Sequence, residues 1–341
     1  MKIKQWLYII STIFLTSVTF FGQDPALCSQ LKVTTLPSDF GSMGTIAVTR
    51  NVTQNPHPDA PLFISTFIPD TATAANRVPV IFFAHGFGGV DYQVYEAMFR
   101  QLASQGYAVV FVPYSVQGTN ASRYDQLWQG FQKAVQQYGN VFDTTRIGFA
   151  GHSYGGGATP EMARRGYAMG WGSNGLFIFT QAAWYSYGTN YGQLPATAKL
   201  VVQVYWEDEV NAHLISQNDV WNRLSQITER KWQVVRPATL FCKLAAGHSI
   251  PTTNVSGSIN ALDYWGIWRR MHALAAYTFR GNAAAKNIAF GVDSYMGRWR
   301  SAPRPITAME AADAPVINTV LTPTFEWARR CAYADPGTPC P

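Results

Sequence analysis

The chain has 341 residues, which is enough for one large α/β domain or two smaller ones with a substantial core. Hydrophobic residues make up 47% of it and charged residues only 13%, a balance that excludes an intrinsically disordered protein. The formal net charge of +6 is spread along the sequence without a basic run, so nucleic acid is not an expected partner.

The N-terminus has the pattern of a secretory signal peptide. Lys2 and Lys4 precede an apolar stretch from Trp6 to Phe21 that is interrupted only by serine and threonine. This stretch is short for a membrane span, which favours cleavage over anchoring. We therefore expect residues 1–22 to be a signal peptide. The mature protein is then secreted, either extracellular or periplasmic, with no stable insertion in a membrane.

Four cysteines follow this segment, and an even number in an exported protein predicts two disulfides with three possible pairings. The turn-rich segment between Cys331 and Cys340 favours a local pair, which leaves Cys28 for Cys242. A lipidated N-terminus at Cys28 is the alternative. It is disfavoured because Leu27 is larger than the residue that bacterial lipoprotein signals usually place there.

The predicted elements alternate after an antiparallel start. Edge strands are expected at 44–49 and 62–68, followed by strands at 78–84, 107–113, 146–150, 175–180, 199–205 and 238–244. Helices are expected at 92–105, 124–138, 218–227 and 261–280, with a further helix directly after residue 153. This alternation predicts an α/β fold with a mostly parallel central sheet and helices on both faces. Residues 23–290 are the expected domain, and residues 291–341 are expected to pack on it as an extension.

A strand, a sharp turn and a helix meet at residues 146–157, where 151–155 read Gly-His-Ser-Tyr-Gly and match the G-x-S-x-G motif. A serine at the tip of such a turn has a strained backbone, so its neighbours two positions away must be small. Glycine at 151 and 155 meets that demand. The motif predicts Ser153 as a nucleophile, although the same letters also fit a glycine-rich turn whose serine caps a helix.

A serine nucleophile requires a base and a group that orients the base, on loops that follow later strands in the order serine, acid, histidine. Residues 206–210 carry three acids, Glu207, Asp208 and Glu209, of which at most one has this role. Residues 245–249 carry His248, which has no apolar stripe to pack into. The oxyanion of the reaction needs two backbone donors. The amide of Tyr154 is one, and the other is expected in the glycine-rich loop 85–89.

Residues 60–280 resemble the α/β-hydrolase superfamily, and within it the cutinase-like polyester hydrolases and the dienelactone hydrolase-type esterases. The resemblance lies in Gly86-Phe87, in residues 143–157, in Gln-Ala-Ala-Trp at 181–184, and in the loops of residues 206–210 and 245–249. The resemblance assigns the orienting acid to Asp208, with Glu209 as the fallback. It places the second oxyanion donor on Phe87.

Substrate contacts are implied by the same resemblance. Trp184 corresponds to a tryptophan that contacts aromatic ester substrates in the family, and Tyr185 is expected beside it. Residues 181–198 are too few for a separate cap domain, so we expect an open groove lined by aromatic side chains. The chain departs from polyester hydrolases at Tyr154, where they usually carry methionine, and in residues 281–341, which have no counterpart.

The sequence therefore indicates a secreted serine hydrolase that cleaves carboxylic esters through an acyl-enzyme intermediate. Bulky or polymeric esters of the cutin and polyester type are the first candidate substrates, and a polymer surface is a candidate partner. The alternatives are a small soluble-ester or lipid esterase, a peptidase and a non-catalytic relative that binds a partner. No cofactor and no metal are expected, and the protein is expected to be a monomer.

Overall fold

The computed structural model describes residues 34–240, 242–253, 259–300, 304–320 and 327–336. The expected signal peptide at residues 1–22 lies outside these ranges, as do Cys28 and Cys340. The signal peptide and both disulfide pairings therefore stay predictions.

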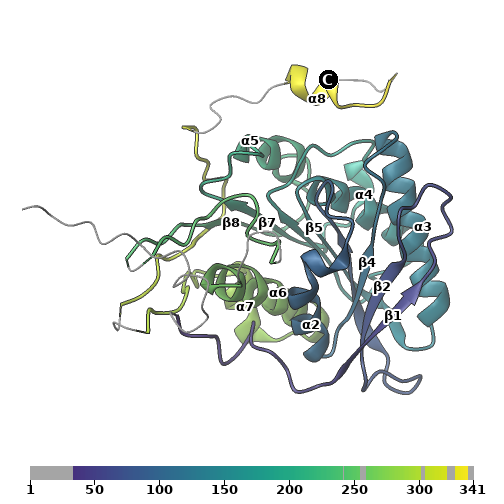
Figure 1. The fold of residues 1–341 in the computed structure, drawn as a ribbon, viewed down its shortest axis with the longest axis horizontal. Helices are drawn as coiled ribbons and strands as arrows, with labels where there is room; N and C mark the ends of the chain where they lie inside the picture. Colours follow the sequence, from purple (N-terminus) through teal and green to yellow (C-terminus); the bar gives the residue numbers. More distant parts are fainter. Residues whose placement is uncertain (1–33, 241, 254–258, 301–303, 321–326, 337–341) are drawn as a thin grey trace, which may run out of the picture.

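A nine-stranded mixed sheet forms the centre of the molecule, in the order β1-β2-β4-β3-β5-β6-β7-β8-β9 (Figure 1). Its strands are β1 (Val48–Thr53), β2 (Ile64–Pro69), β3 (Val78–Ala84), β4 (Ala108–Val112), β5 (Phe142–His152), β6 (Leu176–Gln181), β7 (Lys199–Tyr205), β8 (Glu229–Val235) and β9 (Glu310–Ala312). The neighbouring pairs from β4 to β8 are parallel, whereas β1, β2 and β9 join antiparallel at the edges. The predicted α/β class with a mostly parallel sheet is confirmed.

Helices cover both faces of the sheet, because the central strands are buried on both sides. On one face the core contains side chains of α2 (Glu96–Ser104), α6 (Arg269–Arg280) and α7 (Ala283–Phe290). On the other face it contains side chains of α3 (Asn120–Tyr138), α4 (Tyr154–Ala168) and the π-helix η4 (Ser216–Trp221). Shorter pieces are η2 (Tyr92–Val94), η3 (Tyr191–Gln193), α5 (His213–Ile215), the π-helix η5 (Leu262–Trp268) and α8 (Trp327–Ala332).

The strand that precedes His248 differs from the prediction. The chain forms β8 at Glu229–Val235, and residues 238–244 are not a strand of the sheet, since Ala238 and Leu244 only pair with each other in an isolated bridge. β8 begins with three charged residues, so its sequence lacks the apolar run that predicts a buried strand. Lys231 is buried in the sheet and reaches Asp313 with its ammonium group, so a charged residue can occupy an interior strand position.

Three other elements have shifted boundaries. The first edge strand is at Val48–Thr53 and not at 44–49. The segment predicted as a helix at 218–227 forms α5 and η4 instead, at residues 213–221. Helix α3 begins earlier than expected because the Thr119 hydroxyl accepts a hydrogen bond from the Ser122 amide at 3.1 Å and caps it.

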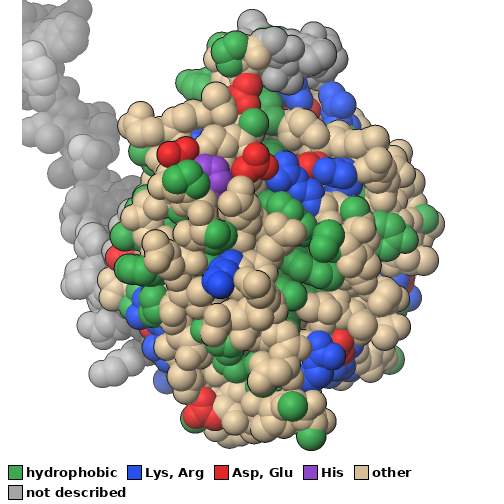
Figure 2. All heavy atoms as spheres, turned by 90° about the vertical axis from the view of Figure 1, so that its right-hand side faces the viewer, with side chains coloured by type: hydrophobic (Ala, Val, Ile, Leu, Met, Phe, Trp, Pro, Cys, Tyr) green, Lys and Arg blue, Asp and Glu red, His purple; other side chains and the backbone are tan. Residues whose placement is uncertain are grey.

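The surface carries its charges in small groups. On the face nearest β1, β2 and α3, lysine and arginine side chains of the described residues lie among acidic ones and do not form one continuous band (Figure 2). In the part of the chain that the structure describes, no helix is long and apolar enough to cross a membrane.

A buried carboxyl group, that of Asp263, makes the free energy of unfolding depend on pH. Burial raises the pKa of Asp263, in η5, from 3.8 to about 8, and the side chain accepts a hydrogen bond from the Asn260 amide at 2.8 Å. The unfolded chain loses this proton near pH 4 and the folded chain loses it near pH 8. Between these values the folded state holds the extra proton, so the free energy of unfolding falls as pH rises.

We expect Asp263→Asn to flatten this decline, because asparagine keeps the shape and an acceptor oxygen but cannot ionise. Between pH 5 and 8 the wild type should lose stability with a slope of at most about 1.4 kcal/mol per pH unit from this group. Urea denaturation at several pH values measures the slope. Asp59→Asn, at an exposed carboxylate, is the control. Parallel curves for wild type and Asp263→Asn would contradict the assignment.

Candidate active site

Ser153 stands between the end of β5 and the start of α4, in a strained backbone conformation with φ 54° and ψ −120°. The two glycines of the motif make this turn possible. A Cβ on Gly151 would lie 2.4 Å from the Gly155 carbonyl oxygen, and one on Gly155 would lie 2.0 Å from the Ala84 carbonyl oxygen. Real Cβ atoms do not approach that closely, so both positions require glycine. The turn therefore packs directly against the end of β3 through Gly155.

A chain of hydrogen bonds joins Ser153 to a histidine and a carboxylate. The Ser153 Oγ lies 2.9 Å from His248 Nε2, and His248 Nδ1 lies 2.8 Å from Asp208 Oδ2. Asp208 follows β7 and His248 lies on the loop after β8, so both come from the carboxyl ends of strands beyond β5. The three side chains that the sequence selected lie in one line of contacts.

The three neighbouring acids have different surroundings. Asp208 is 2% exposed, and its Oδ1 accepts hydrogen bonds from the amides of Val210 and Asn211 at 2.9 and 2.8 Å. Glu207 accepts from the Ala246 amide at 3.0 Å and pairs with Lys243, so it braces the loop of His248. Glu209 is exposed. Of the three acids, Asp208 contacts His248, whereas Glu207 stabilises the loop that carries His248.

The direction of the hydrogen bonds assigns the histidine tautomer. Nδ1 of His248 faces the carboxylate, which only accepts, so Nδ1 carries the proton and donates it to Asp208. Nε2 then has a free lone pair toward the Ser153 hydroxyl. This is the form in which imidazole can take the proton of the serine.

A second histidine holds the first in place. His152 Nε2 donates to the His248 carbonyl oxygen at 2.9 Å, and its Nδ1 accepts from the Tyr95 hydroxyl at 3.0 Å. That hydroxyl in turn accepts from the Gly86 amide at 3.0 Å. Burial, followed by the charge of His248, holds the pKa of His152 well below its usual value, so His152 stays neutral. The loop of His248 and loop 85–89 are therefore tied together by uncharged groups.

Two backbone amides beside Ser153 are free to bind an anion. Loop 85–89 passes close to the serine, since a Cβ on Gly86 would lie 3.4 Å from the Ser153 Cβ. Among the described residues, the N–H groups of Phe87 and Tyr154 have no hydrogen-bond acceptor. Two amides without acceptors next to a nucleophile suit the binding of an oxyanion.

Asn211 is a contact that the sequence reasoning missed. Its Nδ2 donates to the Ala182 carbonyl oxygen at 2.7 Å and approaches the Ser153 Oγ at 3.3 Å. Ala182 and Ser153 are the two described residues other than glycine with positive φ. Asn211 therefore contacts two strained positions, and no local pattern in the sequence singled it out.

Ser153 opens on a cavity of about 440 Å³. The lining is largely aromatic and apolar, and the residues are Phe87, Asn120, Arg123, Ser153, Tyr154, Trp184, Val210, Asn211 and Tyr333. Trp184 lies in it as expected. Tyr185 does not, because its side chain is 1% exposed and packs in the core beside α4, so its expected contact with substrate is corrected.

The C-terminal arm, residues 330–336, supplies one wall of this cavity. The Tyr333 ring lies 5.4 Å from that of Trp184, and the Asp335 carboxylate accepts from the amides of Asn120 and Ala121 at 2.6 and 2.8 Å, at the N-terminus of α3. Arg330 forms a buried ion pair with Asp219 at 2.9 Å. The expected open groove is thus narrowed on one side, by contacts too distant in sequence to predict.

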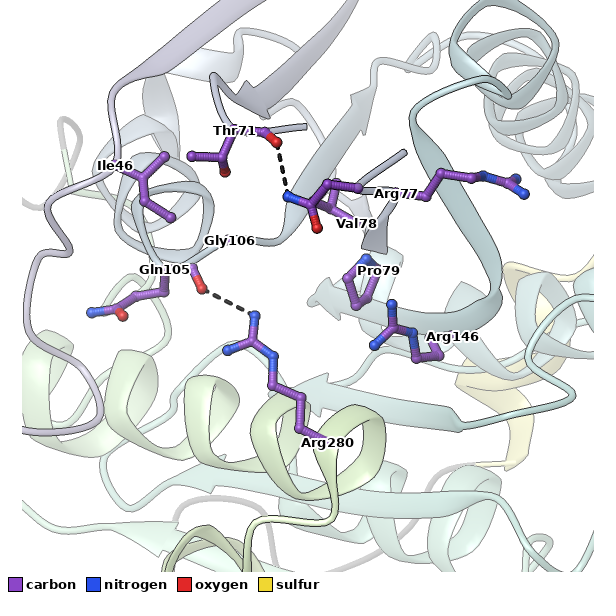
Figure 3. A pocket seen from close by; sticks show the side chains of 10 residues that line it. Ile46, Thr71, Arg77, Val78, Pro79, Gln105, Gly106, Arg146 and Arg280 are labelled. Carbon is purple, nitrogen blue, oxygen red and sulfur yellow. Dashed lines mark hydrogen bonds between the residues drawn. The ribbon is translucent and has the colours of Figure 1, made fainter. Parts of the chain in front are cut away.

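A second hollow, of about 300 Å³, lies near the amino end of β3, whereas Ser153 lies at the carboxyl ends of the strands (Figure 3). Arg280 donates to the Gln105 carbonyl oxygen at 3.2 Å, and Arg146 pairs with Asp143 at 2.5 Å. Arg77 donates to the Phe142 carbonyl oxygen at 2.7 Å. None of the residues that line this hollow is a serine, cysteine or histidine, so it is no rival to the Ser153 site.

Within the described residues, no group of three or more histidine, cysteine and carboxylate side chains is placed to hold a metal ion. No family model matches the chain, and no curated protein is significantly similar to it.

The site geometry predicts that Ser153 reacts with a fluorophosphonate. Its Oγ should attack the phosphorus, release fluoride and transfer its proton to His248, which gives one covalent adduct in intact-mass spectra. Ser153→Ala should remove the adduct, whereas Ser249→Ala, on the neighbouring loop, should keep it. Undiminished labelling of Ser153→Ala would contradict the assignment.

Proposed function

We propose that this protein is a serine hydrolase of the α/β-hydrolase type that cleaves carboxylic esters through an acyl-enzyme. The observation that carries the proposal is the hydrogen-bonded series of Ser153, His248 and Asp208 at the carboxyl edge of a parallel sheet. The nucleophile elbow after β5 and the chain order of serine, acid and histidine support it. Export of the mature protein, after removal of residues 1–22, is part of the proposal.

The reaction would begin with attack of the Ser153 Oγ on the ester carbonyl, while His248 Nε2 takes the hydroxyl proton. Asp208 stabilises the imidazolium that forms. The negative charge on the carbonyl oxygen would be bound by the amides of Phe87 and Tyr154. Collapse of this intermediate breaks the bond to the alcohol, which leaves with the proton from Nε2.

Water would complete the cycle. His248 Nε2 accepts a proton from water as its oxygen attacks the acyl-serine, and the same two amides bind the second oxyanion. Collapse returns the proton to the Ser153 oxygen and releases the carboxylic acid. The neutral His152 beside His248 favours this cycle, because a second positive charge there would oppose the imidazolium.

The substrate is proposed to be a bulky ester with aromatic or apolar parts, and polyester or cutin-like chains are within this class. Trp184 and Tyr333 form an aromatic pair at the cavity, and Phe87 is 58% exposed beside it. Residues 182–198 contain one short helix, η3, and no cap domain. These features suit a flat, apolar acyl group.

A small soluble ester is the second candidate substrate. The cavity of about 440 Å³ is of the size that holds one small molecule, and the C-terminal arm closes it on one side. A polymer chain would have to enter along the remaining open side. A non-catalytic binding role is disfavoured, because all three members of the triad are present and in contact.

We expect Asp208→Asn to lower kcat at least ~10-fold, because the amide would leave His248 in the wrong tautomer. Glu209→Gln, at an exposed carboxylate, is the matched control and should keep most of the activity. Ser153→Ala should lower kcat by roughly 10⁴–10⁶-fold with the fold intact. Hydrolysis of 4-nitrophenyl butyrate, with circular dichroism as the test of folding, measures all three. If Asp208→Asn stayed active and Glu209→Gln became inactive, Glu209 would be the acid that orients His248.

Trp184→Ala distinguishes the two substrate candidates. If the ring binds a flat acyl group, hydrolysis of an aromatic ester or a polyester film should fall by roughly an order of magnitude more than that of 4-nitrophenyl butyrate. Release of soluble products from the film and initial rates on the soluble ester give the comparison. Equal losses on all substrates would give Trp184 a structural role.

A further inference from the structure

Arg123 is the charged residue among those that line the cavity of Ser153. The other described lining residues are aromatic, aliphatic, amide or hydroxyl side chains, so the cavity presents a cation and no anion. Asp208 is not one of the lining residues. Its Oδ2 accepts a hydrogen bond from His248, and its Oδ1 accepts from two backbone amides. The cavity therefore offers one positive charge among largely apolar walls, which complements a ligand that carries one anionic group.

The guanidinium is held in place by uncharged groups. Its Nε and Nη2 donate to the carbonyl oxygens of Ser115 and Val116 at 3.2 and 2.8 Å, and Nη1 donates to the Asn120 Oδ1 at 3.3 Å. The group lies 5.4 Å from the centroid of the Phe87 ring and 5.6 Å from that of Tyr154. The charge is therefore fixed beside the two residues whose amides face the oxyanion position.

Arg123 keeps unused hydrogen-bonding capacity. A guanidinium has five N–H groups. Three of them donate to these acceptors, and the Tyr154 hydroxyl is a further side-chain partner, so not all five are used. No carboxylate of the described residues lies within ion-pair distance. Asp335, on the nearby C-terminal arm, uses both of its oxygens on the amides at the N-terminus of α3. Within the described part of the chain, no carboxylate is therefore paired with Arg123.

We propose that Arg123 binds a carboxylate of the substrate, so that the preferred substrates are esters that carry a free carboxylate, such as monoesters of dicarboxylic acids. This inference rests on the proposed ester hydrolysis. Arginine suits the role because its planar guanidinium keeps its charge and can bind a carboxylate with two parallel hydrogen bonds. The aromatic and apolar walls would hold the chain between the carboxylate and the scissile ester.

A matched pair of substrates tests the proposal. The 4-nitrophenyl monoester of adipic acid carries a carboxylate where 4-nitrophenyl 6-methylheptanoate carries an isopropyl group of the same shape. Arg123→Gln should raise KM for the adipate ester by roughly tenfold or more, since a hydrogen bond to a charged group is typically worth that much. KM for the neutral ester should change less than about twofold, and kcat for both should be nearly unchanged.

Two further variants separate charge from fold. Arg123→Lys should retain part of the preference for the adipate ester, because the charge remains and the planar geometry is lost. Arg100→Gln removes a surface charge that is paired with Glu96 and should change neither KM. Added salt should weaken the preference of the wild type.

The possible outcomes are distinct. Equal effects of Arg123→Gln on both esters, including a general loss from misfolding, would overturn the role of Arg123 and leave ester hydrolysis standing in the wild type. A wild type that hydrolyses neither ester, or a Ser153→Ala variant as active as the wild type, would overturn the proposed function itself.

Discussion

The strained backbone of Ser153 is the constraint on which the site depends. Its conformation costs on the order of 1–3 kcal/mol and persists only where the surroundings hold it. Here the Ser153 amide donates to the Gln181 carbonyl oxygen at 2.8 Å, and the Ser153 carbonyl accepts from the amides of Gly157 and Trp184 at 3.0 and 2.8 Å. β5, β6 and α4 therefore fix the turn from both sides. The Ser153 side chain is thereby presented at the carboxyl ends of the central strands.

The same edge concentrates groups that burial keeps uncharged. His152 is neutral because its pKa is held well below its usual value, and burial lowers the pKa of His85 to about 4. Burial also raises the pKa of Tyr95, so its hydroxyl keeps its proton. These groups supply hydrogen bonds without adding charge. In the proposed reaction, the charge that develops would then be confined to His248, Asp208 and the oxyanion.

Helix α3 connects the cavity with the far end of the chain. Asn120, its first residue, accepts hydrogen bonds from the Tyr154 hydroxyl at 2.8 Å and from Arg123, and it donates to the Tyr333 carbonyl oxygen at 2.6 Å. The C-terminal arm, Tyr154 and the cation of the cavity, Arg123, thus meet at one amide side chain. The position of the arm and the electrostatics of the cavity are parts of one network.

The sequence by itself determined the elements whose signals are local. The alternation of strands and helices predicted a mostly parallel sheet, and the glycines at 151 and 155 identified the turn, because steric clashes between near neighbours allow no larger residue there. The order of serine, acid and histidine located the loops that meet at the site. The choice of Asp208 among three acids came from a resemblance, and the contact of Asp208 with His248 is in accord with it.

Other features were decided by the tertiary structure alone. β8 carries charges that are neutralised by partners far along the chain, so its pattern does not look like a buried strand. Tyr185 looked like Trp184 in the sequence, but the packing of α4 buries one ring and leaves the other in the cavity. Tyr333 and Arg123 joined the site through long-range contacts that no local pattern records. Local sterics and periodicity are written in the sequence, whereas burial and charge pairing between distant segments exist only once the chain has folded.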